Sequence, residues 1–381
     1  MNVYIIGVGI ALRGKISPDV SFRELIYEAA EKAYLDAGIE PRDVDTFVCV
    51  SEDFEEGTSI FDEYVPDQLG AVLKPVHTIC ADAITGIASL YAQIKTGYFK
   101  IGVLEAHSKL SNIKNHHHLF SMALDPIYVR PLEINPYALI ALEMAMFLDS
   151  RGYDELDTAH VVTKNKANAL LFGRSPFGSI IPPEEVLLSK PVSEPLRELD
   201  ISPNADGACV IVVANEEIAK ERNRDFIKIQ GVGFGEFTPN IERWEGDAEY
   251  LSVAARKAYS MAGIRNPIKE IDFAEIDDTF SYKELQHLEA LSLARYGESA
   301  ELLREGFYDL SGELPVNPTG GNLGNGNFSL MNGARAIYDA ILQLRKSASN
   351  VQLREPETAL LASWKGFPSA SGGVLILKRE G

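Results

Sequence analysis

Two adjacent acids and a distant amide are the side chains best suited to acid–base chemistry in this sequence. Asp277 and Asp278 follow an apolar run and precede a helix expected from Lys283 onward. Burial can raise the pKa of a carboxyl group until it accepts protons near neutral pH, and an amide can donate to an oxyanion. Asp277, Asp278 and Asn327 are therefore candidates for such chemistry. The alternative is that the acidic pair stabilises a helix N-terminus.

Cys80 is the cysteine whose position suits a nucleophile, because it lies just before a helix of small residues at 87–92. The alternative is a buried core residue at a strand end, which is the commoner situation of a free cysteine. Cys49 and Cys209 lie within apolar runs and are expected in the core. Three dispersed cysteines predict neither a disulfide framework nor a cysteine-based zinc site.

The histidines favour structural roles. His116, His117 and His118 are adjacent, and no carboxylate or cysteine is spaced to complete a metal site with them. We expect a polar loop face there and no bound metal. His77 either lines a pocket or has a structural role at a strand end.

Glycine-bearing segments supply the remaining site candidates. Residues 317–327 are rich in Gly and Asn, and they predict a loop whose backbone N–H groups point at an anion or oxyanion. A second glycine-bearing turn is expected at 364–373, before the last strand. The predicted substrate or oxyanion residues are Thr85, Gly86, Asn317, Gly320, Gly321, Gly326 and Gly372.

An internal repeat indicates how these segments are positioned. Residues 29–39 (AAEKAYLDAGI) and 254–264 (AARKAYSMAGI) are identical at eight of eleven positions. Each copy is expected to be a helix between two strands, at 5–9 and 46–50 for the first copy and at 229–233 and 271–276 for the second. The repeat predicts a duplicated α/β fold with halves related by a pseudo-two-fold axis.

The predicted N-terminal half covers residues 1–222, and the predicted C-terminal half covers residues 223–381. The first half is expected to contain a polar, proline-bearing loop excursion at about 111–199, interrupted by an amphipathic helix at 137–150. Loops of this length often cover a ligand site.

The chain resembles the thiolase superfamily, in particular the archaeal and sterol-carrier-protein-type thiolases. The resemblance includes SMALDPIY at 121–128, KNKANA at 164–169, LDISPNADGA at 199–208 and LPVNP at 314–318. It implies a duplicated, five-layered αβαβα fold and a homodimer or tetramer. It also implies a coenzyme A thioester as substrate or ligand, with no covalently bound cofactor.

The residues that perform thiolase chemistry are replaced. Aligned on Thr85-Gly86, the family's nucleophilic cysteine falls on Ala83, and its two histidines fall on Asp277 and Asn327. The resemblance therefore implies Asp277 as a base and Asn327 as an oxyanion donor. A methyl group cannot form a thioester. The resemblance thus implies a non-classical acyl-CoA-binding subunit of an acyl-CoA-processing complex, for which ordinary thiolysis is not expected.

A second resemblance, at 320–324 and 331–333, is to thiolase-fold aldolases of steroid side-chain degradation. Those enzymes need a base and an oxyanion hole but no acyl-enzyme. Three alternatives therefore stay open: a silent binding subunit, an aldolase-like lyase, and an acyltransferase that uses Cys80. Tyr282 is a nearby phenol or a packing residue. This branch also implies a small partner with an OB-fold and a zinc ribbon.

Composition excludes several classes of function. The 381 residues carry a formal net charge of −19 with scattered Lys and Arg, which disfavours nucleic-acid binding. No apolar run approaches the roughly 18 residues of a membrane-spanning helix. The N-terminus reads as a strand rather than a signal peptide, so we expect a cytoplasmic protein.

Overall fold

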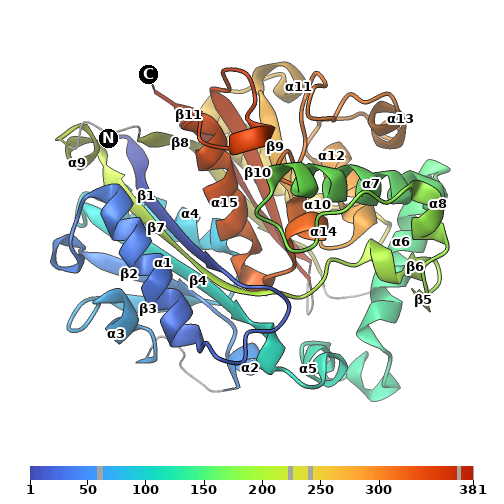
Figure 1. Cartoon of the computed structure of the whole chain (residues 1–381), viewed down its shortest axis with the longest axis horizontal. Helices are drawn as coiled ribbons and strands as arrows, with labels where there is room; N and C mark the ends of the chain where they lie inside the picture. Colours follow the sequence, from blue (N-terminus) through green and yellow to red (C-terminus); the bar gives the residue numbers. More distant parts are fainter. Residues whose placement is uncertain (58–62, 222–225, 239–242, 367–369, 381) are drawn as a thin grey trace.

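The computed structural model describes residues 1–57, 63–221, 226–238, 243–366 and 370–380 (Figure 1). Among these residues, the strands of the main sheet follow the order β3-β2-β4-β7-β1-β8-β11-β10-β9. Their bounds are β1 (Val3–Leu12), β2 (Thr46–Val50), β3 (Val76–Ile79), β4 (Ile101–Lys109), β7 (Asp206–Asn215), β8 (Ile227–Glu236), β9 (Phe273–Ile276), β10 (Thr358–Lys365) and β11 (Ser371–Arg379). A small separate sheet contains β5 (Pro191–Ser193) and β6 (Leu196–Arg197).

The strand pairing is the same in both halves. β1 pairs with β7 and β7 with β4 in antiparallel fashion, and β4 pairs with β2 in parallel. β8, β11, β10 and β9 repeat this pattern in the same order. Val316 bridges Ala274 in parallel, at the place that β3 takes beside β2 in the first half. The halves meet where Tyr4 and Ile5 of β1 pair with Lys228 and Ile227 of β8.

The repeated helices are α1 (Phe22–Ala37) and α10 (Glu249–Ala262), and each packs on the first strand of its half. The Gly-x-Gly sequences of β1 and β8 make this close packing sterically possible. A Cβ at Gly9 would lie 2.1 Å from Ala29 O, and one at Gly233 would lie 2.1 Å from Ala254 O. The two glycine pairs are therefore helix-packing sites, related by the duplication.

A tyrosine of each repeat anchors its helix to a later segment of the same half. Tyr34 donates to Leu69 O at 2.7 Å, and Tyr259 donates to Leu291 O at 2.7 Å. Leu69 ends the short helix α3 (Pro66–Leu69), and Leu291 follows α12 (Ser281–Ala290). Identical residues thus make the same kind of contact in both halves, as the repeat predicts.

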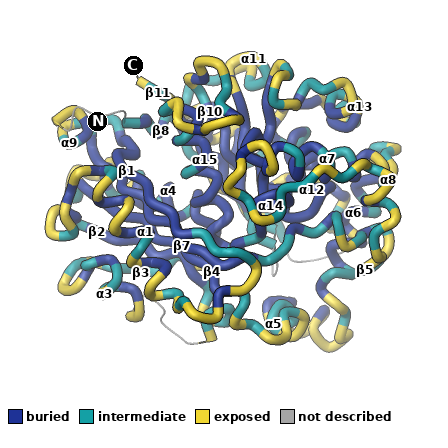
Figure 2. Tube along the Cα trace, in the orientation of Figure 1, coloured by how far each residue is buried: buried dark blue, intermediate teal, exposed yellow. Residues whose placement is uncertain are grey.

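Two helices form the central layer. α4 (Ala83–Lys95) and α15 (Asn332–Leu344) contact each other, and each contacts strands of both halves. α1 covers the outer face of the first half and α10 that of the second, while the strands between are almost wholly buried (Figures 1 and 2). This arrangement confirms the predicted duplicated αβαβα fold.

The predicted loop excursion is mostly helical. It contains α5 (His116–Met122), α6 (Pro136–Arg151), α7 (Glu155–Phe172) and α8 (Pro183–Leu187). The helix predicted at 137–150 is confirmed by α6. α7 was missed because it buries polar side chains, including Lys164, Asn165 and Asn168, and so lacks a simple apolar stripe. The predicted boundary between the halves, at 222/223, lies outside the described residues.

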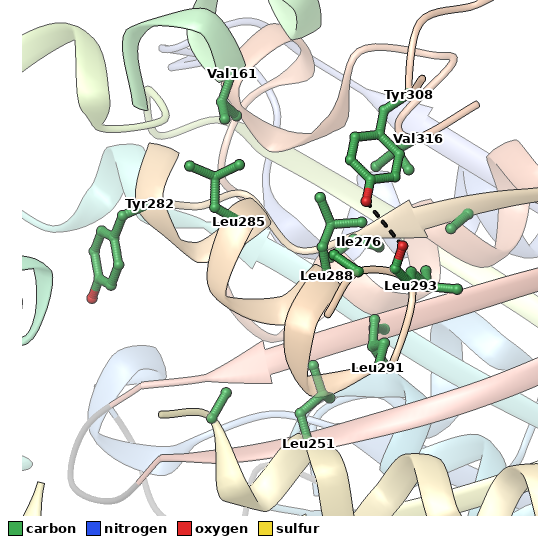
Figure 3. Packing of buried hydrophobic residues seen from close by; sticks show 14 of the residues in the cluster. Val161, Leu251, Ile276, Tyr282, Leu285, Leu288, Leu291, Leu293, Tyr308 and Val316 are labelled. Atoms are coloured by element: carbon green, nitrogen blue, oxygen red, sulfur yellow. Dashed lines mark hydrogen bonds between the residues drawn. The ribbon is translucent and has the colours of Figure 1, made fainter. Parts of the chain in front are cut away.

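The remaining helices are α2 (Asp53–Glu56), α9 (Glu216–Glu221), α11 (Pro267–Glu270), α13 (Ser299–Arg304) and α14 (Gly321–Asn325). Leu285 and Leu288 of α12 pack in one apolar cluster with Leu291 and Leu293, which follow the helix, and Tyr308 of the same cluster donates to Leu293 O at 2.9 Å (Figure 3). This cluster fixes the helix that follows Asp277 and Asp278. No helix among the described residues has the length and apolar character needed to cross a membrane.

Candidate functional site

A pocket of about 850 Å³, part of it open to solvent, lies where strand ends of the two halves meet the helical excursion. Its lining includes the aromatic side chains of Phe54, Phe120, Tyr137, Phe280 and Trp364. It also includes the polar side chains of Glu55, Asn204, Asn327, Ser329, Asn332 and Lys365. A pocket that combines apolar surface with a few polar groups is typical of a small-molecule site.

Asn327 is the predicted site residue that lines this pocket directly. Its Oδ1 accepts from Ser329 N and from Asn332 Nδ2, both at 2.9 Å. These two bonds fix the amide so that its Nδ2 serves as the donor. Nδ2 meets Asn204 Oδ1 at 3.4 Å, a long hydrogen bond with which a substrate oxygen can compete.

Asp277 lies behind this pocket. It lines a smaller, buried cavity together with Asn322 and Ser363. Its Oδ1 accepts from Thr279 N at 2.9 Å, and its Oδ2 accepts from Asn322 Nδ2 at 3.0 Å. Burial raises the pKa of Asp277 to about 6, against these hydrogen bonds, which lower it. The carboxyl group is thus able to hold a proton, but it is not part of the lining of the larger pocket, whereas its hydrogen-bond partner Thr279 is.

Asp278 stabilises a helix N-terminus, although not that of the helix that follows it in the chain. Its carboxylate accepts from the backbone N–H groups of Asn322 and Leu323, in the first turn of α14, and from Asn165 Nδ2 at 2.7 Å. The glycine-rich segment 317–327 therefore directs these N–H groups at Asp278, which corrects the prediction of a loop with free anion-binding groups. Burial, with Glu284 nearby, raises the pKa of Asp278 to about 7.

Cys80 is exposed, so the expectation of a core residue is wrong for this cysteine and right for buried Cys49 and Cys209. Cys80 lies between β3 and Asp82, the N-cap of α4. Lys365 Nζ lies 3.7 Å from its sulfur and forms an ion pair with Glu52. Partial burial and the neighbouring Glu52 raise the pKa of the Cys80 thiol to about 11, although Lys365 opposes them.

The residues aligned with the family's nucleophile motif are structural in their contacts. Ala83 is fully buried at the start of α4. Thr85 donates through N and Oγ1 to Asp82, at 3.4 and 3.1 Å. A Cβ at Gly86 would lie 2.5 Å from Leu104, so this glycine allows α4 to pack closely on the sheet.

The other predicted oxyanion residues are held within the protein. Asn317 is buried, accepts from Ile276 N at 2.8 Å and donates to Glu284 at 2.7 Å. Gly320 packs against Ala169, Gly321 against Asp278, and Gly326 against Ala205. Gly372 was expected in a turn and instead lies inside β11, opposite Trp364 of β10 and Gly235 of β8.

The histidines and Tyr282 lie outside the pocket lining. His116–His118 begin α5 rather than forming a loop face, with Asn115 Oδ1 accepting from His118 N at 3.0 Å. His77 is in β3, and its Nε2 lies 3.3 Å from Gln93 Nε2. Tyr282 is buried and donates to Glu143 at 2.9 Å. No group of three potential metal ligands occurs in the described parts of the chain.

Glu55 is a pocket residue that the sequence analysis missed. It lies in α2, and Ser329 Oγ donates to its Oε2 at 2.7 Å. Burial, together with Glu52 and Glu56, raises the pKa of Glu55 to about 7, while Ser329 and Lys365 lower it. A usable signal existed: the acidic run 52–56 follows the carboxyl end of a strand, the position from which the other site candidates were selected.

The duplicated αβαβα architecture with a pocket at the junction of its halves defines a protein of the thiolase fold. Residues 244–379 match the family described as thiolase C-terminal domain-like. The chain is 26% identical to acetyl-CoA acetyltransferase of Methanothermobacter thermautotrophicus, over 94% of this chain and 95% of the relative. It is 25% identical to 17-hydroxy-3-oxo-4-pregnene-20-carboxyl-CoA lyase of Mycobacterium tuberculosis, over 97% and 98%.

A solved structure described as the Ltp2-ChsH2(DUF35) aldolase has the same fold, with a TM-score of 0.83 at 22% identity over 99% of this chain and 98% of that chain. The chain thus has the thiolase fold, its C-terminal part matches the thiolase C-terminal family model, and over nearly its whole length it is similar to an acetyl-CoA acetyltransferase and to the steroid lyase. These findings confirm the resemblance that the sequence motifs indicated.

Proposed function

We propose that the chain binds an acyl-CoA thioester in the large pocket and forms no acyl-enzyme. The observation that carries this proposal is the lining of the pocket, which combines several aromatic side chains with amide groups and has no cysteine among its described residues. The aromatic side chains favour an apolar acyl group, and Asn327, whose Oδ1 is occupied by two hydrogen bonds, has its Nδ2 left to donate to a thioester oxygen.

This activity belongs to a non-classical subunit of an acyl-CoA-processing complex in the cytoplasm, as a homodimer or tetramer. The description of the aldolase structure names a second component, ChsH2(DUF35). By analogy, we propose a small partner with an OB-fold and a zinc ribbon that helps to hold the coenzyme A part. Size-exclusion chromatography with light scattering tests the oligomer, and a monomer would contradict that part of the proposal.

A second candidate function is a lyase that cleaves a β-hydroxyacyl-CoA. It is favoured by carboxyl groups of raised pKa beside the amide donors. A base takes the proton of the β-hydroxyl, the Cα–Cβ bond breaks, and its electron pair forms a thioester enolate whose oxygen accepts from Asn327. Protonation at Cα then gives a carbonyl compound and a shorter acyl-CoA. Asp277 is the candidate for this base from the sequence, and Glu55, which lines the pocket, is a second candidate from the structure.

The acyltransferase alternative requires a Cys80 thiolate. It is disfavoured because the pKa of this thiol is raised to about 11. Intact-mass spectrometry after incubation with acetoacetyl-CoA tests it. An acetyl adduct on Cys80 would contradict the proposal that no acyl-enzyme forms.

Tryptophan fluorescence provides the binding test, because the chain has two tryptophans and only one of them, Trp364, lines the pocket. We expect 3-phenylpropanoyl-CoA to change the emission and to bind at least about tenfold more tightly than free coenzyme A, about 1.4 kcal/mol. Trp364→Phe should abolish the change, whereas Trp244→Phe should keep it. Equal affinity for the ester and for coenzyme A would contradict acyl binding in the pocket.

A further inference from the structure

The proposed lyase needs a proton-transferring group that reaches the bound substrate. Asp277 does not line the large pocket, and both of its carboxylate oxygens accept hydrogen bonds from Thr279 and Asn322. Asp278 is bound to the first turn of α14. Glu55 is the carboxylate that lines the large pocket together with Asn327, within the described part of the chain.

We propose that Glu55 is the proton-transferring group of this pocket: its carboxylate removes the proton of the substrate β-hydroxyl and returns it to the α-carbon of the enolate. The step rests on the proposed lyase function and is balanced without a co-reactant. The O–H proton moves to Glu55, the β-carbon becomes a carbonyl as the Cα–Cβ bond breaks, and the same proton then forms the new Cα–H bond.

A single residue, Ser329, orders the base and the oxyanion donor together. Its Oγ donates to Glu55 Oε2 at 2.7 Å, and its N–H donates to Asn327 Oδ1 at 2.9 Å. The carboxylate of Glu55 and the amide of Asn327 are therefore linked through Ser329, and all three residues line the pocket. This is the arrangement that a reaction with a base at one atom and an oxyanion at another requires.

The surroundings of Glu55 suit a group that both accepts and returns a proton. Burial, together with the negative charges of Glu52, the N-cap of α2, and of Glu56, its last residue, raises the pKa of Glu55 to about 7. Ser329 and the ammonium group of Lys365 oppose this shift, and Lys365 is itself paired with Glu52. The helix α5, which packs against α2, contributes the titratable side chains of His116, His117 and His118. Near neutral pH, Glu55 is thus divided between its two protonation states.

Deuterium exchange isolates this proton transfer from bond cleavage. The full-length chain is incubated with 3-phenylpropanoyl-CoA in D₂O, and deuterium at the α-carbon is measured by mass spectrometry. We expect exchange with the wild type and an at least 100-fold slower rate with Glu55→Gln, at unchanged affinity for the ester. The matched control is Asp53→Asn, an exposed acid on the same helix, whose rate should stay within about threefold of the wild type.

The outcomes separate this inference from the proposed function. No binding of the ester contradicts the proposed function itself. Binding without any exchange in the wild type, or undiminished exchange in Glu55→Gln, overturns the role of Glu55 and leaves binding intact. Loss of exchange in Asp277→Asn with retention in Glu55→Gln overturns it in favour of Asp277. Loss of ester affinity in Glu55→Gln also contradicts a role confined to proton transfer.

Discussion

The α-carbon of Gly321 lies directly against the carboxylate of Asp278, where a Cβ would stand 2.3 Å from Oδ2. The residue also has a positive φ of 57°. Glycine is required here because only the absence of a side chain lets the carboxylate reach the amides of α14. The glycine-rich segment, which suggested anion binding in the sequence, thus binds the protein's own anion.

We expect Gly321→Ala to destabilise the fold by about 2–4 kcal/mol, since the new methyl group would displace the Asp278 carboxylate. Gly97→Ala is the matched control: Gly97 also has a positive φ, of 79°, but a Cβ there meets nothing within 4 Å. Gly97→Ala should lower the free energy of unfolding by only about 1 kcal/mol. Urea unfolding of both variants measures the difference, and equal losses would contradict the contact with Asp278.

The duplicated Gly-x-Gly contacts give a second prediction. Gly9→Ala and Gly233→Ala would each drive a methyl group into a helix backbone carbonyl at 2.1 Å. Both should lower the free energy of unfolding by a similar amount, about 2–3 kcal/mol, because the two sites are related by the duplication. Gly14→Ala, which meets nothing within 4 Å, is the control. A large loss at only one site would argue against equivalent packing.

Asp277 should make stability depend on pH. Its pKa is about 6 in the folded chain and near 3.9 when unfolded, so the folded state binds more protons between these values. Its contribution to the free energy of unfolding therefore falls as pH rises from about 4 to about 6. An amide at this position does not titrate. As the pH rises from 4 to 7, the free energy of unfolding of Asp277→Asn should therefore increase by about 2–3 kcal/mol relative to that of the wild type.

Urea unfolding of the wild type and of Asp277→Asn at these two pH values measures this change. Asp19→Asn, at an exposed position, controls for the loss of one negative charge. A difference between Asp277→Asn and wild type that does not vary with pH would show that Asp277 does not carry the raised pKa. Turnover measured on the same samples tests its predicted role as a base.

Cys80 should react slowly with iodoacetamide although it is exposed. At pH 8 a thiol with a pKa of about 11 is ionised in about one molecule in a thousand, against about one in ten for a pKa of 9. We expect labelling about 100-fold slower than for an unperturbed thiol. Glu52→Gln should speed it by about tenfold, because the Lys365 charge then acts on the thiol unopposed. Rapid labelling of the wild type, with protection by acyl-CoA, would restore the nucleophile hypothesis.

The sequence by itself determined the duplicated fold. Its repeat predicted α1 and α10, and its apolar run predicted β2 at Thr46–Val50. These features are local, because helix periodicity and strand composition depend on residues that are close together in the chain. α7 escaped detection because its buried polar side chains find their partners in distant segments.

Tertiary structure alone decided which residues share the pocket. Glu55, Asn327 and Trp364 come from segments far apart in the chain and line one pocket. Asp277 lines the smaller cavity instead, although Thr279, two residues later in the chain, lines the large pocket. The exposure of Cys80 was also decided by folding, because its surroundings include Lys365 and Glu52 from other parts of the chain. Burial, charge neighbours and access to a pocket are properties of chain segments brought together by folding. The spacing of residues along the chain does not encode them directly.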